Sequence, residues 1–217
     1  MAKNISKKEL LKKPDEFITL SNRTLNWTRE NYKSVVWGIS GIILIAAVYF
    51  GYSAYRSHQE NQAHDKYFSS QEQSDQAQKL KQLEGLVRDY PGTQGAHLAM
   101  ISIANVYYQK KEFPKAITYY QMALEKGGFQ EDTVTLIKEN LAYAYEEKGD
   151  YPSAVKTYNE ITQGKETFQK EEAMMSLARV YQKMGKKDEA KKTYQDFMRT
   201  YPNSVYANLV RNQLSKI

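Results

Sequence analysis

The sequence lacks the residue combinations with which most enzymes and metalloproteins work. It contains no cysteine and only three histidines. His58 and His64 are six residues apart, whereas two metal-binding histidines on one helix are usually four apart. His97 has no evident carboxylate or serine partner, and residues 38–41, which combine glycine with serine, lie inside a long apolar run. We therefore expect no catalytic residue, no metal site, no cofactor and no small-molecule substrate.

What the sequence does contain is one pattern that occurs three times. In each copy two alanines lie 12 residues apart, a tyrosine follows the first by three residues, and another follows the second by four. The copies start 38 and then 36 residues apart, a period typical of solenoid repeats. The three copies are Ala104, Tyr107, Ala116 and Tyr120; Ala142, Tyr145, Ala154 and Tyr158; and Ala178, Tyr181, Ala190 and Tyr194.

The spacing within each copy predicts two helices joined by a tight turn. Residues three or four apart share one helix face, and an alanine beside a tyrosine allows two helices to approach closely. Pro114 and Pro152 suit the first turn of a second helix, where the missing N–H costs little. Gly149 and Gly185 suit the end of a first helix, where a left-handed residue is needed. The pattern therefore predicts an all-α fold of stacked helical hairpins.

This pattern resembles the tetratricopeptide repeat (TPR), whose period is about 34 residues. The resemblance implies full repeats at 97–130, 135–168 and 171–204. The chain departs from the family pattern at Met100, Lys138 and Met174, where a tryptophan is common. The resemblance implies a TPR helical-hairpin solenoid that binds other proteins. A generic amphipathic helical bundle is the alternative.

Incomplete elements flank the three repeats. Residues 77–91 echo residues 189–202, so we predict a degenerate repeat at 59–92 and about three and a half repeats in total. The polar stretch Ser69–Gln78 is predicted to be a loop. Residues 205–217 are predicted to form a capping helix, because a solenoid must close its last apolar face.

Residues 35–55 form a run of 21 residues without a charge. A helix of that length covers about 31 Å, which matches the hydrocarbon core of a bilayer. Trp37 near one end and Tyr52 and Tyr55 toward the other suit the two membrane interfaces. We therefore predict a single transmembrane helix. Cleavage as a signal peptide is the competing interpretation, because Gly51-Tyr52-Ser53 has the small-x-small form of a cleavage site.

The basic residues predict an orientation for this helix. Residues 1–34 hold eight basic side chains, whereas the twenty residues after the run hold only Arg56 and Lys66. The positive-inside rule then places 1–34 in the cytoplasm as a basic arm and 56–217 across the membrane. In a bacterium the predicted location is thus the inner membrane with a periplasmic repeat domain. The absence of cysteine is compatible with that oxidising compartment.

Much of the net charge of +6 comes from the arm. Its basic excess lies beside a membrane, so it favours anionic lipid head groups and does not indicate nucleic-acid binding. Residues 14–16 suit a helix start, and Phe17, Leu20 and Trp27 offer an apolar side. An interfacial helix and a solvated tail with a docking motif are the two interpretations of the arm.

The resemblance to TPR proteins also implies a partner-binding groove on the first helix of each hairpin. The chaperone-binding members of the family hold an acidic C-terminus with lysine and arginine. Ile101 and Glu139 stand at one such position here, so recognition of an acidic C-terminus is not expected. The groove residues carried over are Leu98, Ile101, Asn105 and Tyr108; Leu136, Glu139, Tyr143 and Glu146; and Glu172, Met175, Arg179 and Gln182.

The order of parts (basic arm, one anchor, periplasmic TPR domain) resembles the bacterial family of ancillary Sec translocon subunits. This resemblance implies a non-enzymatic adaptor that recruits a chaperone or client polypeptide near the translocon. The expected partners are translocon subunits, a periplasmic chaperone or secretory clients, with the bilayer contacted through 35–55. A scaffold for a dedicated envelope assembly, in division, secretion or the outer membrane, is the alternative.

Overall fold

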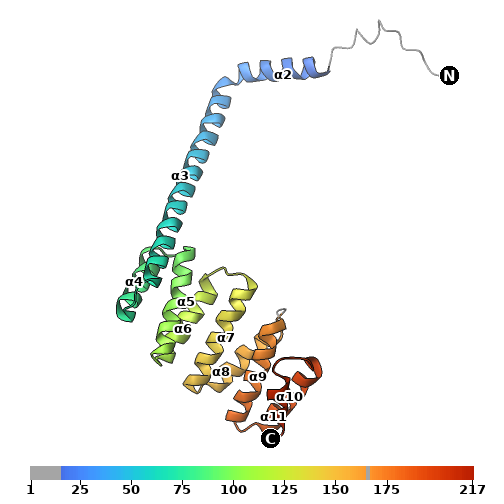
Figure 1. The fold of residues 1–217 in the computed structure, drawn as a ribbon. Coiled ribbons are helices and arrows are strands. Elements are labelled where there is room, and N and C mark those ends of the chain that lie inside the picture. Colours follow the sequence, from blue (N-terminus) through green and yellow to red (C-terminus); the bar gives the residue numbers. More distant parts are fainter. Residues whose placement is uncertain (1–15, 165–166) are drawn as a thin grey trace, which may run out of the picture. The chain divides into compact units, whose positions relative to one another are not determined.

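The computed structural model describes residues 16–164 and 167–217, and these residues form ten helices and no strand (Figure 1). Consecutive helices are joined by connections of one to six residues. The helices are α2 (Glu16–Glu30), α3 (Tyr32–Gln71), α4 (Gln76–Asp89), α5 (Gln94–Gln109), α6 (Phe113–Lys126), α7 (Glu131–Lys148), α8 (Tyr151–Thr162), α9 (Thr167–Lys183), α10 (Lys187–Thr200) and α11 (Ala207–Leu214).

The chain divides into two compact units, Met1–Ser57 and His58–Ile217. The first contains α2 and the part of α3 up to Ser57, which includes the whole uncharged run at 35–55. The predicted membrane span, residues 35–55, lies within α3, which is long and apolar enough to cross a bilayer. Its apolar side chains are exposed along this stretch. Helix α2 begins at Glu16, and residues 1–15 of the predicted basic arm lie outside the described residues.

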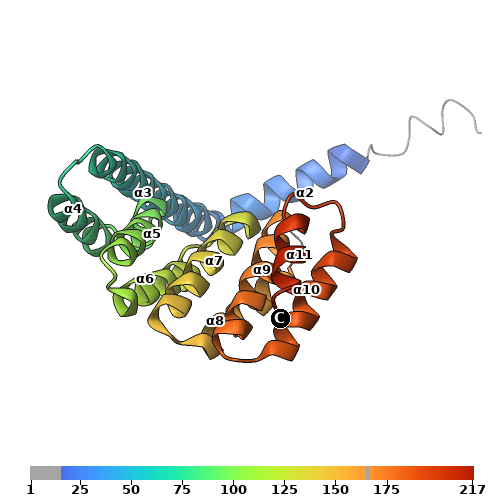
Figure 2. The same cartoon turned by 60° about the horizontal axis from the view of Figure 1, so that its bottom comes forward.

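The second unit consists of helical hairpins that follow one another in chain order (Figures 1 and 2). Helices α5 and α6, α7 and α8, and α9 and α10 form three pairs, and each pair also packs on the next. Helix α4 packs on α5, and α11 packs on α10. The predicted all-α solenoid of TPR-like hairpins is therefore confirmed.

The turns show the local chemistry that the sequence pattern indicated. Gly149 caps α7 with a φ of 83°, and Gly185 after α9 has a φ of 74°. Both angles lie in the left-handed region, which glycine adopts without strain. Pro114 and Pro152 stand in the first turns of α6 and α8. Each hairpin turn is thus encoded by the residues that form it.

The repeated alanines and tyrosines form the core of the second unit. All six alanines of the pattern have no exposed surface, and Tyr120, Tyr158 and Tyr194 are at most 3% exposed. Alanine keeps the helices close, and the tyrosine ring fills the space between them. Burial of each ring contributes about 2 kcal/mol or more.

The degenerate unit is tied to the first full repeat by close contact of α3 with α5. A Cβ atom on Gly95 would lie 2.6 Å from the backbone carbonyl atoms of Ala63, so only glycine fits there. The hydroxyl groups of Tyr67 and Ser102 lie 3.2 Å apart and also join these helices. Ala63 also shares a core cluster with Leu83 and Leu86 of α4, so the end of α3 acts as the first helix of a further hairpin with α4.

One predicted loop was too long. Residues 69–78 were expected to be irregular, but only residues 72–75 separate α3 from α4. Ser70 is buried, and its hydroxyl bonds to the carbonyl of Tyr67, which continues the helix. Asp75 then caps α4 by accepting from the backbone N–H groups of Ala77 and Gln78. Polar composition indicated a loop here, while the contacts of individual polar side chains extend both helices.

Candidate functional site

The first helices of the three full hairpins, α5, α7 and α9, carry all twelve predicted groove residues. We call the surface made by these twelve residues the first-helix face. Its members differ in exposure: Asn105 and Leu136 are exposed, Glu139 and Glu146 are buried, and the other eight are half-buried. The face therefore combines accessible side chains with others that are held inside the domain.

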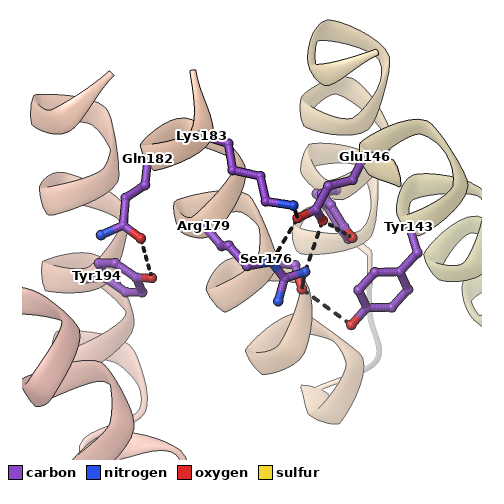
Figure 3. A network of polar contacts seen from close by, with 8 residues as sticks. Tyr143, Glu146, Ser176, Arg179, Gln182, Lys183 and Tyr194 are labelled. Carbon is purple, nitrogen blue, oxygen red and sulfur yellow. Dashed lines mark hydrogen bonds and ion pairs between the residues drawn. The ribbon is translucent and has the colours of Figure 1, made fainter. Parts of the chain in front are cut away.

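A charged network joins α7 to α9 on this face (Figure 3). The side chain of Glu146 is only 3% exposed and accepts two hydrogen bonds from Arg179, at 2.9 Å from Nε and 3.0 Å from Nη2. Lys183 Nζ lies 2.9 Å from the same carboxylate. Burial would raise the pKa of Glu146, but the hydrogen bonds from these two cations outweigh it and lower the pKa below its usual range. Glu146 is therefore an ionised, fully engaged carboxylate at neutral pH.

Tyr143 and Ser176 extend this network. The guanidinium of Arg179 lies 5.7 Å from the centre of the Tyr143 ring, within the range of a cation–π contact. Arg179 also donates to Ser176 Oγ at 3.2 Å, and the Tyr143 hydroxyl lies 3.4 Å from the same oxygen. The structure thus brings Tyr143 and Glu146 of α7 together with Arg179 of α9, which the sequence analysis placed in another repeat without pairing them.

Ser176 and Lys183 were not among the predicted residues. Lys183 stands one helical turn after Arg179, which places both cations on the same side of α9. Ser176 repeats a contact already present between the degenerate unit and the first full repeat, where Ser102 meets Tyr67. In each case the tyrosine precedes the serine by roughly one repeat. This recurrence is the sequence signal by which Ser176 could have been found.

The buried tyrosines of the second helices reach through the hairpins to the first-helix face. Tyr120 donates to Asn105 at 2.5 Å, Tyr158 to Glu146 at 3.4 Å, and Tyr194 to Gln182 at 3.5 Å. Burial raises the pKa of all three phenols, so each hydroxyl remains a donor at neutral pH. A polar member of the face in each hairpin is therefore positioned from behind by a core residue (Figure 3 shows Tyr194 and Gln182).

Two carboxyl groups meet at the other end of α7 and α9. Glu139 is 7% exposed and lies against Glu172. Burial, followed by the hydrogen bond and charge of Glu172, raises the pKa of Glu139 to about 7. The Tyr206 hydroxyl donates to Glu172 at 2.6 Å, and the Ser204 hydroxyl donates to Glu171. The C-terminal segment thus closes this end of the first-helix face.

The apolar members of the face divide into packed and accessible side chains. Ile101 and Tyr108 pack against the core around α5, and Met175 packs against the core beneath α11. Leu136 is 52% exposed and is the most accessible apolar side chain among the twelve. It stands on α7 about one turn from Glu139, so an apolar contact point lies beside the carboxyl pair.

The histidines take up separate positions in the described part of the chain. His58 bonds to Gln62 at 2.8 Å, and the ring of His64 lies 4.5 Å from that of Phe68. His97 is buried beside Phe129. Within residues 16–164 and 167–217, no three metal-ligating side chains are grouped to hold an ion. The first-helix face accordingly offers recognition by shape, charge and apolar contact.

Comparison with known proteins agrees with the fold of helical hairpins. A protein-family model described as "Tetratricopeptide repeat-like domain" matches residues 26–217. No curated protein matches the chain in sequence.

Solved structures share the fold. A tetratricopeptide repeat protein from Parabacteroides merdae ATCC 43184 is similar over 73% of this chain and 60% of its own, with 18% identity and a TM-score of 0.59. The match thus spans less than two thirds of that protein. PilF of Pseudomonas aeruginosa is similar over 73% of this chain and 68% of its own, with 19% identity and a TM-score of 0.52. At these identities the likeness concerns the fold alone.

Proposed function

Because the chain belongs to the tetratricopeptide repeat-like family, we propose that it is a membrane-anchored adaptor that binds other proteins through its first-helix face. The TPR-like fold is typically a protein-interaction scaffold. The finer part of the proposal is that the adaptor recruits a chaperone or a client polypeptide near the Sec translocon. Helix α3 would hold it in a bacterial inner membrane, with residues 1–34 cytoplasmic and 56–217 periplasmic.

The proposal rests on one observation: polar side chains of the first-helix face are fixed by hydrogen bonds before any partner binds. Glu146 and Arg179 are fixed by two hydrogen bonds, and Tyr158 supports Glu146 from the core. Such a preorganised polar surface loses little side-chain entropy when a partner binds. Leu136 adds an exposed apolar anchor at the other end of α7, beside Glu139. A segment with alternating apolar and polar side chains would match this arrangement.

Anchoring explains how a modest surface can serve as an adaptor. The face offers few exposed apolar groups, so its affinity for a single segment is expected to be weak. Tethering through α3 would confine it to the membrane surface and raise its effective concentration there. The basic excess of residues 1–34 supports the orientation, because basic residues accumulate on the cytoplasmic side.

The proposal is tested by photocrosslinking in native membranes. A photoreactive residue is placed at Leu136 or at Tyr108 on the first-helix face, and matched controls carry it at Thr118 on α6 and Lys156 on α8. All except the half-buried Tyr108 are exposed positions. The expected result is capture of translocon subunits, a chaperone or diverse secretory chains from Leu136 and Tyr108, with little capture from the controls.

Two results would contradict parts of this proposal. Capture of one envelope protein in stoichiometric yield would replace the translocon adaptor with a dedicated scaffold. Equal capture from the first-helix face and from Thr118 and Lys156 would remove the face as the binding surface.

A further inference from the structure

Helix α2 carries large apolar side chains that no described residue of its own unit covers. Leu20, Leu25 and Trp27 are 71%, 53% and 58% exposed. Leu20 and Trp27 are seven residues apart, so they lie almost in line two turns apart. Leu25 borders the other edge of the same side, and Ser21, Thr24 and Thr28 lie between it and the line of Leu20 and Trp27. We call this side, formed by these six residues, the apolar face of α2.

Both threonines of this face use their hydroxyl groups as donors within the helix. Thr24 donates to the carbonyl oxygen of Leu20 at 2.8 Å, and Thr28 donates to that of Thr24 at 2.8 Å. Each hydroxyl is thus engaged with its own helix. The hydroxyl groups of Thr24 and Thr28 can therefore enter an apolar phase without becoming unsatisfied donors, a loss that would otherwise oppose burial.

The charged side chains of α2 lie where they could contact lipid head groups. Around the helix, Arg23 lies just outside the edge formed by Trp27 and Leu20, and Arg29 lies just outside the edge formed by Leu25. Both arginines are exposed, and their long stems can lie along the apolar face while the guanidinium groups reach phosphate oxygens. Asn22, Asn26 and Glu30 occupy the opposite side of the helix. A wide apolar side flanked by arginines is the arrangement of an interfacial helix.

The helix also lies next to the predicted membrane span in the chain. Helix α2 ends at Glu30 and α3 begins at Tyr32, with only Asn31 between them. Asn31 donates to the carbonyl oxygen of Trp27 through its backbone N–H and through its side-chain amide, both at 2.9 Å. This connection is too short to carry α2 far from a bilayer that α3 crosses.

From these observations we propose that α2 lies in the head-group region of the cytoplasmic leaflet and binds anionic phospholipids through Arg23 and Arg29. The inference rests on the anchoring part of the proposed function and goes beyond it by assigning a second, surface-bound contact with lipid. Helix α2 would hold the cytoplasmic end of the anchor at a fixed depth and favour leaflets rich in anionic lipid. Because α3 keeps α2 at the surface, a small intrinsic affinity for lipid is enough.

The chain contains two tryptophans. Trp27 reports on the contact of α2 with lipid, and Trp37 reports on the insertion of α3 into the membrane. The Trp37→Phe variant leaves Trp27 on α2, and the Trp27→Phe variant leaves Trp37 in the predicted span. Full-length protein is reconstituted into vesicles of phosphatidylcholine, with or without phosphatidylglycerol. Fluorescence quenching by lipids brominated at shallow or deep chain positions then measures where each indole lies.

The expected result is shallow quenching of Trp27 that is strong in phosphatidylglycerol vesicles and weak in pure phosphatidylcholine. Replacing both arginines, as Arg23→Gln with Arg29→Gln, should lower the equilibrium constant for surface binding roughly thirtyfold at low ionic strength, about fivefold for each charge. Asn22→Gln with Asn26→Gln is the matched control on the opposite side and should change nothing.

Three results would overturn the inference. If Trp37 is quenched by brominated lipid while Trp27 stays accessible to aqueous iodide, α3 anchors the protein but α2 does not contact lipid, and the inference is wrong. If neither tryptophan is quenched, the anchoring proposal falls with it. If Trp27 is quenched equally in both lipid mixtures, or is shielded in proportion to protein concentration, anionic lipid is not the occupant of the apolar face.

Discussion

The pair of carboxyl groups on α7 and α9 should make the stability of the repeat domain fall as the pH rises. The change that isolates this effect is Glu139→Gln, which keeps the shape of the side chain and can donate to Glu172 at every pH. Glu139 is 7% exposed, and its pKa is raised from 4.5 to about 7. In that pH range the folded protein holds a proton that the unfolded chain has released.

The sign and size of the effect follow from linkage. Because the unfolded state binds fewer protons between pH 4.5 and about 7, the free energy of unfolding falls as the pH rises through that range. A shift of this size corresponds to about 3 kcal/mol. Glu146 acts in the opposite direction, because its lowered pKa gives stability at neutral pH that is lost only as the pH falls through its folded value. The two carboxylates therefore affect different pH ranges.

The assay is urea unfolding of residues 56–217, followed by circular dichroism near pH 5 and near pH 8. Between these pH values the wild type should lose about 3 kcal/mol more than Glu139→Gln does. Glu147→Gln, an exposed carboxyl on the same helix, is the control and should follow the wild type. An equal pH dependence of wild type and Glu139→Gln would refute the reasoning, because the proton would then not be held at this site.

Further predictions concern packing, the charged network and the proposed binding surface. Gly95→Ala should lower the free energy of unfolding by roughly 2–4 kcal/mol, because its Cβ meets the backbone of Ala63, while Gly85→Ala, with only the flexible Arg88 guanidinium 3.9 Å away, should raise it by about 0.5–1 kcal/mol. Thermal unfolding of the two variants separates a steric effect from a general effect of glycine replacement, and similar melting temperatures would contradict the close contact. Glu146→Gln should cost about 1–2 kcal/mol near neutral pH, a figure that allows for the partial exposure of Arg179 and Lys183, and this cost should shrink in acid. Urea unfolding across the pH range tests it, and a cost that persists unchanged in acid would show that charge is not the cause. Leu136→Asp should leave the melting temperature within experimental error, since this side chain is 52% exposed, but should abolish the crosslinks formed from Tyr108. Unchanged crosslinking would remove Leu136 from the binding surface.

The sequence by itself determined the features that depend on near neighbours in the chain. Alanine and tyrosine three or four residues apart define a helix face, and glycine or proline at a turn sets where a helix ends. Gly149 at a φ of 83° and Pro152 in the first turn of α8 show this local encoding directly. The uncharged run at 35–55 likewise predicts one long helix, because its length and composition suffice for that prediction.

Tertiary structure decided the contacts between residues about one repeat apart. Glu146 and Arg179 are separated by 33 positions, and Tyr206 and Glu172 by 34. Repeat spacing places such residues on the same face, but it does not tell which side chains pair, since that depends on the offset between stacked helices. The same offset buries Glu139 against Glu172 and leaves Leu136, on the same helix, in solvent. Burial and charge on this face therefore follow from helix stacking, whereas the helices themselves follow from local sequence.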